Sequence, residues 1–317
     1  MIKLSIYILT SKNEKLVLRG MESIFRQINH PFEVRPIVMV NSLNENYFKS
    51  VGDALDPINF GITDRDTNPK GIIGPICLQS ESNGKPGKGK NACINHFINS
   101  DSDYMMLIDG DDFLYPTALQ MLVRTIKDEA DVVCGCAQDH LQSYNPVKLK
   151  SWEDQEPNLA VTVNRDIYRK NEYNLWHNFS IDRLFLLSNS FLHIFDDRDG
   201  DWFYDDMDLY EDFLFTINIV AIAKTMSCKY TRINNSFIYC YDAVEQGQCN
   251  IFQSNPKLAN ENMELFWDRV GDVLWAIDHR PIKFSDTPFL KLGSPFSFSH
   301  QDKYNYIQEL NKMFGIK

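Results

Sequence analysis

The sequence predicts an α/β protein built on a mostly parallel sheet flanked by helices, and three observations support this prediction. Short apolar strands alternate with amphipathic helical segments through the first half of the chain. The helical segments are long enough to serve as crossovers between neighbouring parallel strands. Polar residues gather where the apolar strands stop, which is where sheets of this kind bind ligands.

The elements of this half are expected in a regular order. Strands are expected at residues 4–9, 34–40, 72–78, 104–108 and 132–136, the third of them being weaker than the others. Helices are expected at residues 16–28, at 92–98 and from Pro116 onward. A polar, irregular excursion is expected at 140–175. An apolar helix is expected at 213–226, followed by an ordered, aromatic-rich extension from 241 to 317.

Composition excludes several classes of protein. The chain has 317 residues, of which 44% are apolar and 24% charged, so it is neither disordered nor a disulfide-stapled miniprotein. Seven cysteines without a C-x-x-C pair indicate reduced thiols, and hence a cytoplasmic location. The apolar run at 213–223 is shorter than the roughly 20 residues that cross a bilayer, so no transmembrane segment is expected.

The most informative motif is Asp109-Gly110-Asp111-Asp112, at the end of an apolar strand. Glycine lets the backbone turn sharply and approach a ligand closely. Asp109 and Asp111 alternate around the turn, so both can converge on one hard cation. Such oxygen ligands suit Mg²⁺ or Mn²⁺, which are held by one or two carboxylates together with water and substrate phosphates. The structural alternative is an acidic turn in which Asp112 caps the next helix.

A second motif is the glycine- and lysine-rich segment 83–91, which leads into a predicted helix. Glycines and lysines ahead of a helix N-terminus favour binding of a diphosphate. The segment also approaches the P-loop pattern, but Asn91 stands where that pattern requires Ser or Thr, and a Mg²⁺ ligand is thereby lost. A solvated flexible loop is the structural alternative.

The third motif ends an acidic run at 196–212, where nine acids and one arginine give −8 of the net charge of −11. This acidic balance does not predict the basic surface that nucleic-acid-binding proteins carry. Glu211 and Asp212 fall in the first turn of the predicted apolar helix, where the helix dipole favours ionised carboxylates. An ionised carboxylate that faces a cleft can act as a general base for a hydroxyl. Helix capping without chemistry is the alternative.

Taken in order, these motifs resemble the family 2 glycosyltransferases of the GT-A fold, over roughly residues 1–240. The family's Gly-rich segment, which ends in Arg/Lys-Asn, is matched by residues 87–92. Its hydrophobic-Asp-x-Asp-Asp element is matched by residues 108–112, with a proline just beyond. An aromatic stretch at 175–179 and the Glu-Asp pair at 211–212 follow in the family's order.

The resemblance implies transfer of a sugar, with inversion, from a nucleotide diphosphate sugar to an acceptor hydroxyl. It implies that Asp212 is the catalytic base, with Glu211 as the fallback. It also implies that Asp111 holds Mn²⁺ or Mg²⁺ with help from Asp109 and Asp112, where the cation neutralises charge on the departing diphosphate. The expected donor-binding residues are Thr10, Asn41, Lys90, Asn91, Asp109 and Gly110, and Trp176 is expected on the acceptor side.

The chain departs from the family after the second strand. The family carries an Asp there, near the donor base, whereas this chain has Asn41, which donates as well as accepts hydrogen bonds. We expect a UDP-sugar donor, with GDP and other nucleotides as open alternatives. The acceptor stays open among a glycan, a lipid-linked acceptor and a protein. Residues 1–240 are expected to form the catalytic domain, and 241–317 an extension that packs on it, as a candidate for the acceptor side.

Three other functions are weighed against this one. A nucleotidyltransferase of similar fold would also use Asp109 and Asp111, but it needs a Gly-rich phosphate loop after the first strand, and residues 10–13 contain no glycine. A P-loop NTPase is disfavoured by Asn91. A non-catalytic sugar- or nucleotide-binding module would have lost metal or base carboxylates, and all of them are present.

Overall fold

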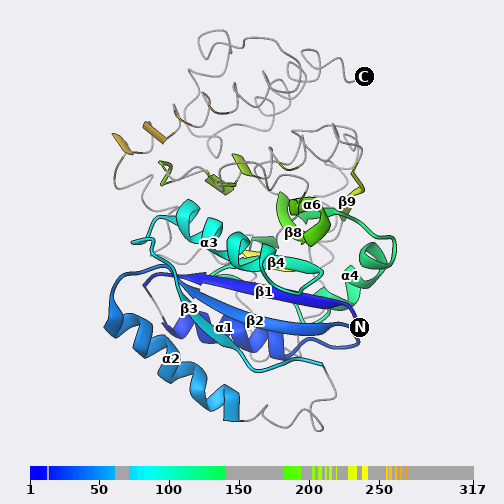
Figure 1. The fold of residues 1–317 in the computed structure, drawn as a ribbon, viewed down its shortest axis with the longest axis horizontal. Coiled ribbons are helices and arrows are strands. Elements are labelled where there is room, and N and C mark those ends of the chain that lie inside the picture. The colour runs from blue at the N-terminus through cyan, green and yellow to red at the C-terminus, as the bar shows by residue number, and fades with distance from the viewer. Residues whose placement is uncertain are drawn as a thin grey trace.

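The central sheet of the protein orders its seven strands β3-β2-β1-β4-β8-β6-β9, as seen in a computed structural model (Figure 1). The structure describes residues 1–12, 14–60, 71–136, 138–139, 182–193, 228–233 and 238–241, together with 202–203, 206–208, 211–212, 214–215, 219, 255, 257–258, 261–262, 265 and 269.

The strands and helices have the following bounds. The strands of the central sheet are β1 (Lys3–Thr10), β2 (Glu33–Val40), β3 (Ile76–Gln79), β4 (Tyr104–Asp109), β6 (Val132–Cys136), β8 (Asp182–Ser188) and β9 (Tyr230–Ile233). A second, three-stranded sheet, ordered β5-β10-β7, consists of β5 (Phe113–Leu114), β10 (Tyr239–Tyr241) and β7 (Gln138–Asp139). The helices are α1 (Glu14–Phe25), α2 (Glu45–Phe60), α3 (Pro86–Ile98), α4 (Ala118–Lys127) and α6 (Asn189–His193).

The central sheet is mostly parallel, which confirms the predicted fold class. Strands β3, β2, β1 and β4 run parallel, and β6 runs parallel to β9. Strand β8 lies between β4 and β6 and is antiparallel to both. Strand β8 is not among the strands expected from the sequence, although its run of leucine and phenylalanine is typical of a buried strand.

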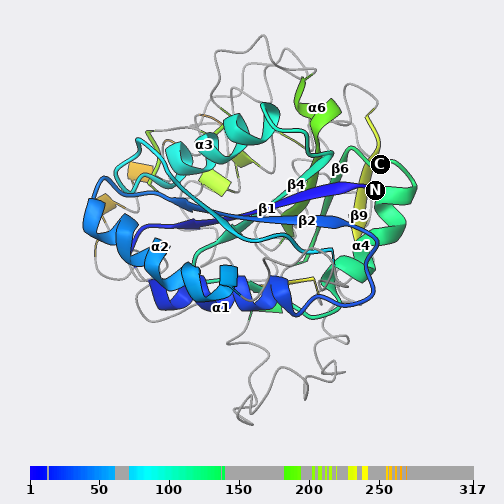
Figure 2. The same ribbon diagram turned by 60° about the horizontal axis from the view of Figure 1, so that its bottom comes forward.

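Helices cover both faces of the sheet, as Figure 2 shows: α3 and α6 lie on one side, and α1 and α2 on the other. The side chains of β1 alternate between these two layers. Leu4, Ile6 and Ile8 pack with the buried faces of α1 and α4, whereas Tyr7 and Leu9 pack with α3. A strand that is buried on both faces reads as a continuous apolar run, and β1 has that pattern.

Two element boundaries differ from the sequence-based expectation. Strand β3 begins at Ile76, and Ile72 makes only an isolated bridge to Val34. Helix α3 begins at Pro86, so the glycines and lysines from residue 87 onward lie inside the helix and not in a loop before it. The excursion expected at 140–175 lies outside the described residues, and so does most of the extension expected at 241–317.

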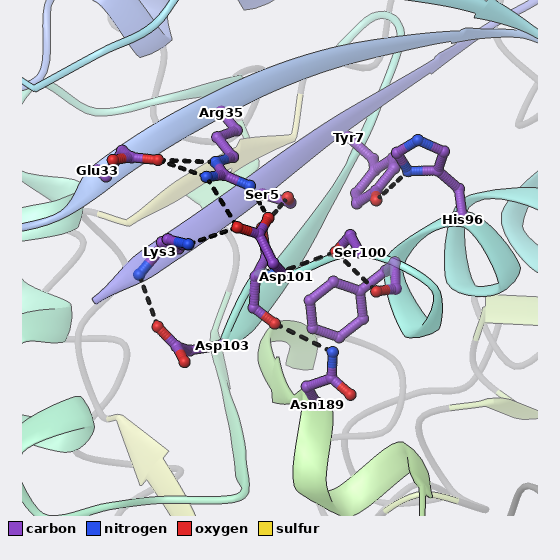
Figure 3. A network of polar contacts seen from close by, with 12 residues as sticks. Lys3, Ser5, Tyr7, Glu33, Arg35, His96, Ser100, Asp101, Asp103 and Asn189 are labelled. Carbon is purple, nitrogen blue, oxygen red and sulfur yellow. Dashed lines mark hydrogen bonds and ion pairs between the residues drawn. The ribbon is translucent and has the colours of Figure 1, made fainter. Parts of the chain in front are cut away.

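The amino-terminal ends of β1, β2 and β4 are joined by a polar network (Figure 3). Asp101 accepts hydrogen bonds from the side chains of both Lys3 and Arg35, and Arg35 also bonds to Glu33. These two cations hold the pKa of Asp101 well below its usual range. The network therefore fixes strand register at the end of the sheet opposite the strand ends where ligands are expected.

Tyr7, which is buried, and His96, which is partly exposed, form a polar contact between β1 and α3, also visible in Figure 3. Tyr7 Oη lies 2.8 Å from His96 Nδ1. Burial lowers the pKa of His96, since the charged imidazolium is poorly solvated there. His96 therefore contributes stability at pH values above its ordinary pKa of about 6.5, and this contribution is lost as pH falls through the lowered pKa of the folded state.

We predict that His96→Gln makes stability less sensitive to acid. Glutamine can still form a hydrogen bond with Tyr7 but cannot ionise near neutral pH. Urea denaturation of both proteins between pH 7.5 and 5 is expected to show a larger loss of unfolding free energy in the wild type. Comparing the two proteins cancels the titration of the groups they share. Equal losses in the two proteins would contradict the prediction.

Candidate active site

The carboxyl ends of β1, β2 and β4 lie side by side and bring three predicted site residues to one edge of the sheet. In the register of these strands, Thr10 is opposite Val40, the residue before Asn41, and Leu9 is opposite Asp109. Ligands bind outside this edge in α/β proteins. The structure therefore brings the predicted residues of separate strands to one place.

The turn after β4 is packed tightly against the end of β1. The backbone N–H of Asp112 donates to the carbonyl of Asp109 at 2.9 Å, which closes the turn. A methyl group at Gly110 would lie 2.5 Å from the carbonyl oxygen of Leu9 and 3.2 Å from Cα of Thr10, so only glycine fits there. Arg19 of α1 donates to the backbone carbonyl of Asp111. The position and shape of the carboxylate turn are thus set by close backbone contacts.

The aspartates of this turn lie in different environments. Asp109 and Asp111 are partly exposed, whereas Asp112 is completely buried. Tyr239 of β10 donates its phenol hydrogen to Asp112 Oδ2 at 2.6 Å, and the same phenol oxygen accepts the backbone N–H of Asp109 at 3.1 Å. This placement favours a supporting role for Asp112 over direct contact with a metal. Sequence reasoning missed Tyr239, because no local motif marks it.

Helix α3 lies directly against the ends of β1 and β2. A methyl group at Gly89 would lie 2.7 Å from the side chains of both Asn41 and Leu9, so glycine permits this approach. The early start of the helix also removes the P-loop interpretation, because the segment after Gly84 is helical from Pro86. The second motif therefore contributes helical residues to the site, and not a phosphate loop.

Lys90 of α3 joins two acidic motifs that are far apart in the sequence. Its Nζ lies 2.9 Å from Glu211 Oε1 and 3.3 Å from Asp109 Oδ1. The lysine is buried, and Nζ also lies 5.6 Å from the centroid of the Phe203 ring. A buried cation requires compensating anions. Lys90 therefore holds the Glu-Asp pair next to the carboxylate turn.

Glu211 and Asp212 are both helical residues, but they differ in exposure. Glu211 is buried, and burial is the main reason that its pKa rises to about 6. The charge of Asp212 raises this pKa further, whereas Lys90 opposes the rise. Asp212 is partly exposed. The pair therefore contains one acid bound to a buried cation and one that reaches solvent.

Asn91 holds a segment of the acidic run against α3. Its Oδ1 accepts the backbone N–H groups of Trp202 at 3.0 Å and Phe203 at 2.7 Å, and its Nδ2 donates to the carbonyl of Phe203 at 2.9 Å. Lys85 pairs with Asp208 at 2.6 Å. These contacts fasten the acidic run to the start of α3, a use of Asn91 that the sequence did not indicate.

Thr10 and Asn41 shape the base of the site through buried side chains. Thr10 Oγ1 shares a 2.6 Å hydrogen bond with Tyr47 Oη of α2. Asn41 Nδ2 donates to the carbonyl of Lys85 at 2.9 Å, and its Oδ1 accepts from Ser80 Oγ at 3.2 Å. Asn41 therefore fixes the loop that enters α3.

Parts of the predicted site lie elsewhere or beyond description. Trp176 lies outside the described residues. Of the extension, Asn262 Oδ1 accepts the backbone N–H of Asp208 at 2.8 Å, and Arg269 pairs with Asp206 at 3.2 Å. These contacts link the extension to the acidic run that leads to Glu211.

The donor set of the carboxylate turn fits a Mg²⁺- or Mn²⁺-type cation that shares its ligands with a substrate. Across the described part of the chain, no three His, Cys, Asp or Glu side chains are clustered so as to hold a metal ion by themselves. Such cations use one or two carboxylates when phosphates and water complete their coordination, and the turn offers two that are partly exposed, Asp109 and Asp111.

Within the same described residues, no helix has the length and apolar character needed to cross a membrane.

Comparison with solved structures identifies the fold. A structure of S. aureus TarS matches 99% of the chain at 14% identity with a TM-score of 0.52, and the chain spans 44% of that protein's length. A structure of residues 1–349 of S. aureus TarS matches with a TM-score of 0.52 at 15% identity, 92% of it being covered. The same piece in complex with UDP-GlcNAc matches with a TM-score of 0.50 at 15% identity, with 99% of this chain and 92% of that chain covered.

Comparison of sequences finds a family model that matches part of the chain. No curated protein matches the chain in sequence. The family model for glycosyl transferase family 2 matches residues 69–195, which include Lys90, Asn91 and the carboxylate turn but end before Glu211. Residues 69–195 are therefore similar to glycosyl transferase family 2, and the chain as a whole shares the GT-A fold of the TarS structures.

Proposed function

We propose that this chain transfers a sugar, with inversion, from a nucleotide diphosphate sugar to an acceptor hydroxyl. The observation that carries the proposal is the position of Lys90 Nζ, 2.9 Å from Glu211 Oε1 and 3.3 Å from Asp109 Oδ1. One acidic motif suits the binding of a metal-bound diphosphate, and the other suits the activation of a hydroxyl. Their meeting at the ligand-binding edge of the sheet supports a site that does both.

The donor side of this proposal uses the carboxylate turn. Asp111 and Asp109 would hold Mn²⁺ or Mg²⁺, and a cation bound there neutralises charge on the departing nucleoside diphosphate. The partly exposed carboxylates and the tight packing of Gly110 against Leu9 support this role. The complex of TarS 1–349 with UDP-GlcNAc, a protein of the same fold, supports a UDP-linked sugar as the donor.

Asp212 is the proposed general base. Glu211 is buried and bound to Lys90, so its removal would leave a buried lysine without a main counter-charge. Asp212 follows it directly and reaches solvent, as a base that meets an incoming acceptor must. The different surroundings of these two neighbouring acids therefore support Asp212 as the base and Glu211 as its support.

In the proposed reaction, the acceptor hydroxyl gives its proton to the Asp212 carboxylate. The acceptor oxygen forms a bond to the anomeric carbon, and the bond between that carbon and the diphosphate oxygen breaks. The configuration inverts because attack and departure occur on opposite faces of the sugar. Holding donor and acceptor together supplies a large part of the rate.

The proposed catalytic domain is residues 1–240, with residues 241–317 as an extension that packs on it. The contacts of Asn262 with Asp208 and of Arg269 with Asp206 support this packing. Because the contacted run leads to the proposed base, we assign the extension to the acceptor side. A glycan, a lipid-linked molecule or a protein could serve as the acceptor.

We predict that UDP raises the melting temperature of the protein in the presence of Mn²⁺. A ligand that binds only the folded state stabilises it by mass action, by about 2.7 kcal/mol at a hundred times its Kd. A thermal-shift panel of UDP, GDP, CDP and ATP, each with and without Mn²⁺, tests this without an acceptor. A metal-dependent shift with another nucleoside diphosphate would change the donor base. A panel without shifts would favour a non-catalytic module.

We predict that Asp111→Asn weakens Mn²⁺-dependent UDP binding by roughly a hundred-fold, or about 2.7 kcal/mol, since the cation that the diphosphate shares would lose a carboxylate ligand. The fold should be retained because the side chain is partly exposed. Asp206→Asn removes the same charge from the acidic run and serves as the control. Calorimetric titration of UDP into each variant with Mn²⁺ measures the effect. Equal affinities in the two variants would remove Asp111 from the metal site.

We predict that Asp212→Asn leaves UDP binding intact and lowers the turnover of a UDP-sugar by roughly a thousand-fold, within the range for loss of a general base. Hydrolysis of the UDP-sugar provides a readout while the acceptor is unidentified. Glu211→Gln is the comparison variant. If Glu211 were the base, the rate would fall as pH drops through about 6, its pKa in the folded protein, and Asp212→Asn would keep its activity.

A further inference from the structure

Tyr239 connects the two ends of the carboxylate turn from a distant part of the chain. Its phenol oxygen accepts the backbone N–H of Asp109 at 3.1 Å and donates to Asp112 Oδ2 at 2.6 Å. Both Tyr239 and Asp112 are buried. Hydrogen bonds to a buried carboxylate are strong, and a buried carboxylate without a donor would be costly. The phenol therefore stabilises the turn in one conformation.

Strand β10 holds this turn by its backbone as well. Tyr239 pairs with Leu114 of β5, and Cys240 pairs with Phe113. Strand β5 begins directly after Asp112. Strand β10 therefore contacts Asp112 through the Tyr239 phenol and the next two residues through its backbone. The direction in which β4 continues into β5 is thus set by β10.

The other contacts of the turn act on its backbone from different elements. Gly110 lies against Leu9 of β1, and Arg19 of α1 donates to the carbonyl of Asp111. The phenol of Tyr239 adds a link to the acid that follows Asp111 and to the amide of Asp109. The two partly exposed carboxylates lie on the segment between these fixed points.

We propose that Tyr239 and Asp112 form a positioning pair that fixes the turn so that Asp109 and Asp111 can converge on a divalent cation bound with the donor diphosphate. The inference rests on the metal-dependent donor binding proposed above. It assigns Asp112 to the support of the turn and not to the cation. Partners of metal ligands commonly alter metal affinity ten- to a hundred-fold when they are removed.

Tyr239→Phe tests this pair, because it removes the phenol oxygen and keeps the ring. We expect Mn²⁺-dependent UDP binding to weaken about ten-fold, measured by calorimetric titration with UDP and Mn²⁺. Tyr7→Phe is the matched control, since it removes the hydroxyl of another buried tyrosine that bonds to His96. Urea denaturation of both variants separates a general loss of stability from a loss of metal-dependent binding. Unchanged binding in Tyr239→Phe, with binding in the wild type, would overturn the inference.

Asp112→Asn gives a second, independent measurement. Its amide oxygen can still accept from Tyr239, so we expect Mn²⁺-dependent binding to weaken less than in Asp111→Asn. An equal loss in these two variants would make Asp112 a ligand and overturn the positioning role. A wild type that binds no nucleotide with Mn²⁺ would instead overturn the proposed function, on which this inference rests. The two failures are therefore distinguishable.

Discussion

The buried cation of Lys90 is the interaction on which the site depends. It joins helix α3 to the carboxylate turn through Asp109 and to the acidic run through Glu211. Because the lysine has little exposure, each of its anions compensates a charge that water cannot reach. Removing a buried partner typically costs about 3–5 kcal/mol. The contacts of Lys90 that assemble the site therefore also stabilise the folded protein.

Helix α3 and the residue before it also supply counter-charges to the acidic run, whose own sequence is almost entirely acidic. Among its described members, Asp208 pairs with Lys85, and Asp206 pairs with Arg269. Asn91 adds backbone hydrogen bonds to the run at Phe203. The run is therefore fastened along α3 and toward the extension. Its excess negative charge is matched by Lys85 and Lys90 near the start of α3 and by Arg269 of the extension.

The sequence predicted the mostly parallel sheet and its flanking helices, because both follow from local pattern. A short apolar run identified β1, and the carboxylates after β4 marked the turn. The start of α3 was not predictable, because glycines disfavour a helix in the absence of tertiary contacts that require them. Gly89 is such a case, since a side chain there would collide with Asn41. Tyr239 could not be found either: its role depends on the pairing of β10 with β5, which joins segments more than a hundred residues apart.

In both acidic motifs, neighbouring acids differ in their burial and in their partners. In the turn, Asp112 is buried and bonded to Tyr239, whereas Asp109 and Asp111 reach solvent. In the Glu-Asp pair, Glu211 is buried and bonded to Lys90, whereas Asp212 reaches solvent. Chemically similar carboxylates take different roles when their surroundings differ. A buried acid with a fixed partner holds the backbone, and its solvent-facing neighbour is thereby held in place, as the proposed binding of a ligand requires. Sequence motifs contain both members of such a set, so assigning their roles requires the contacts of each side chain.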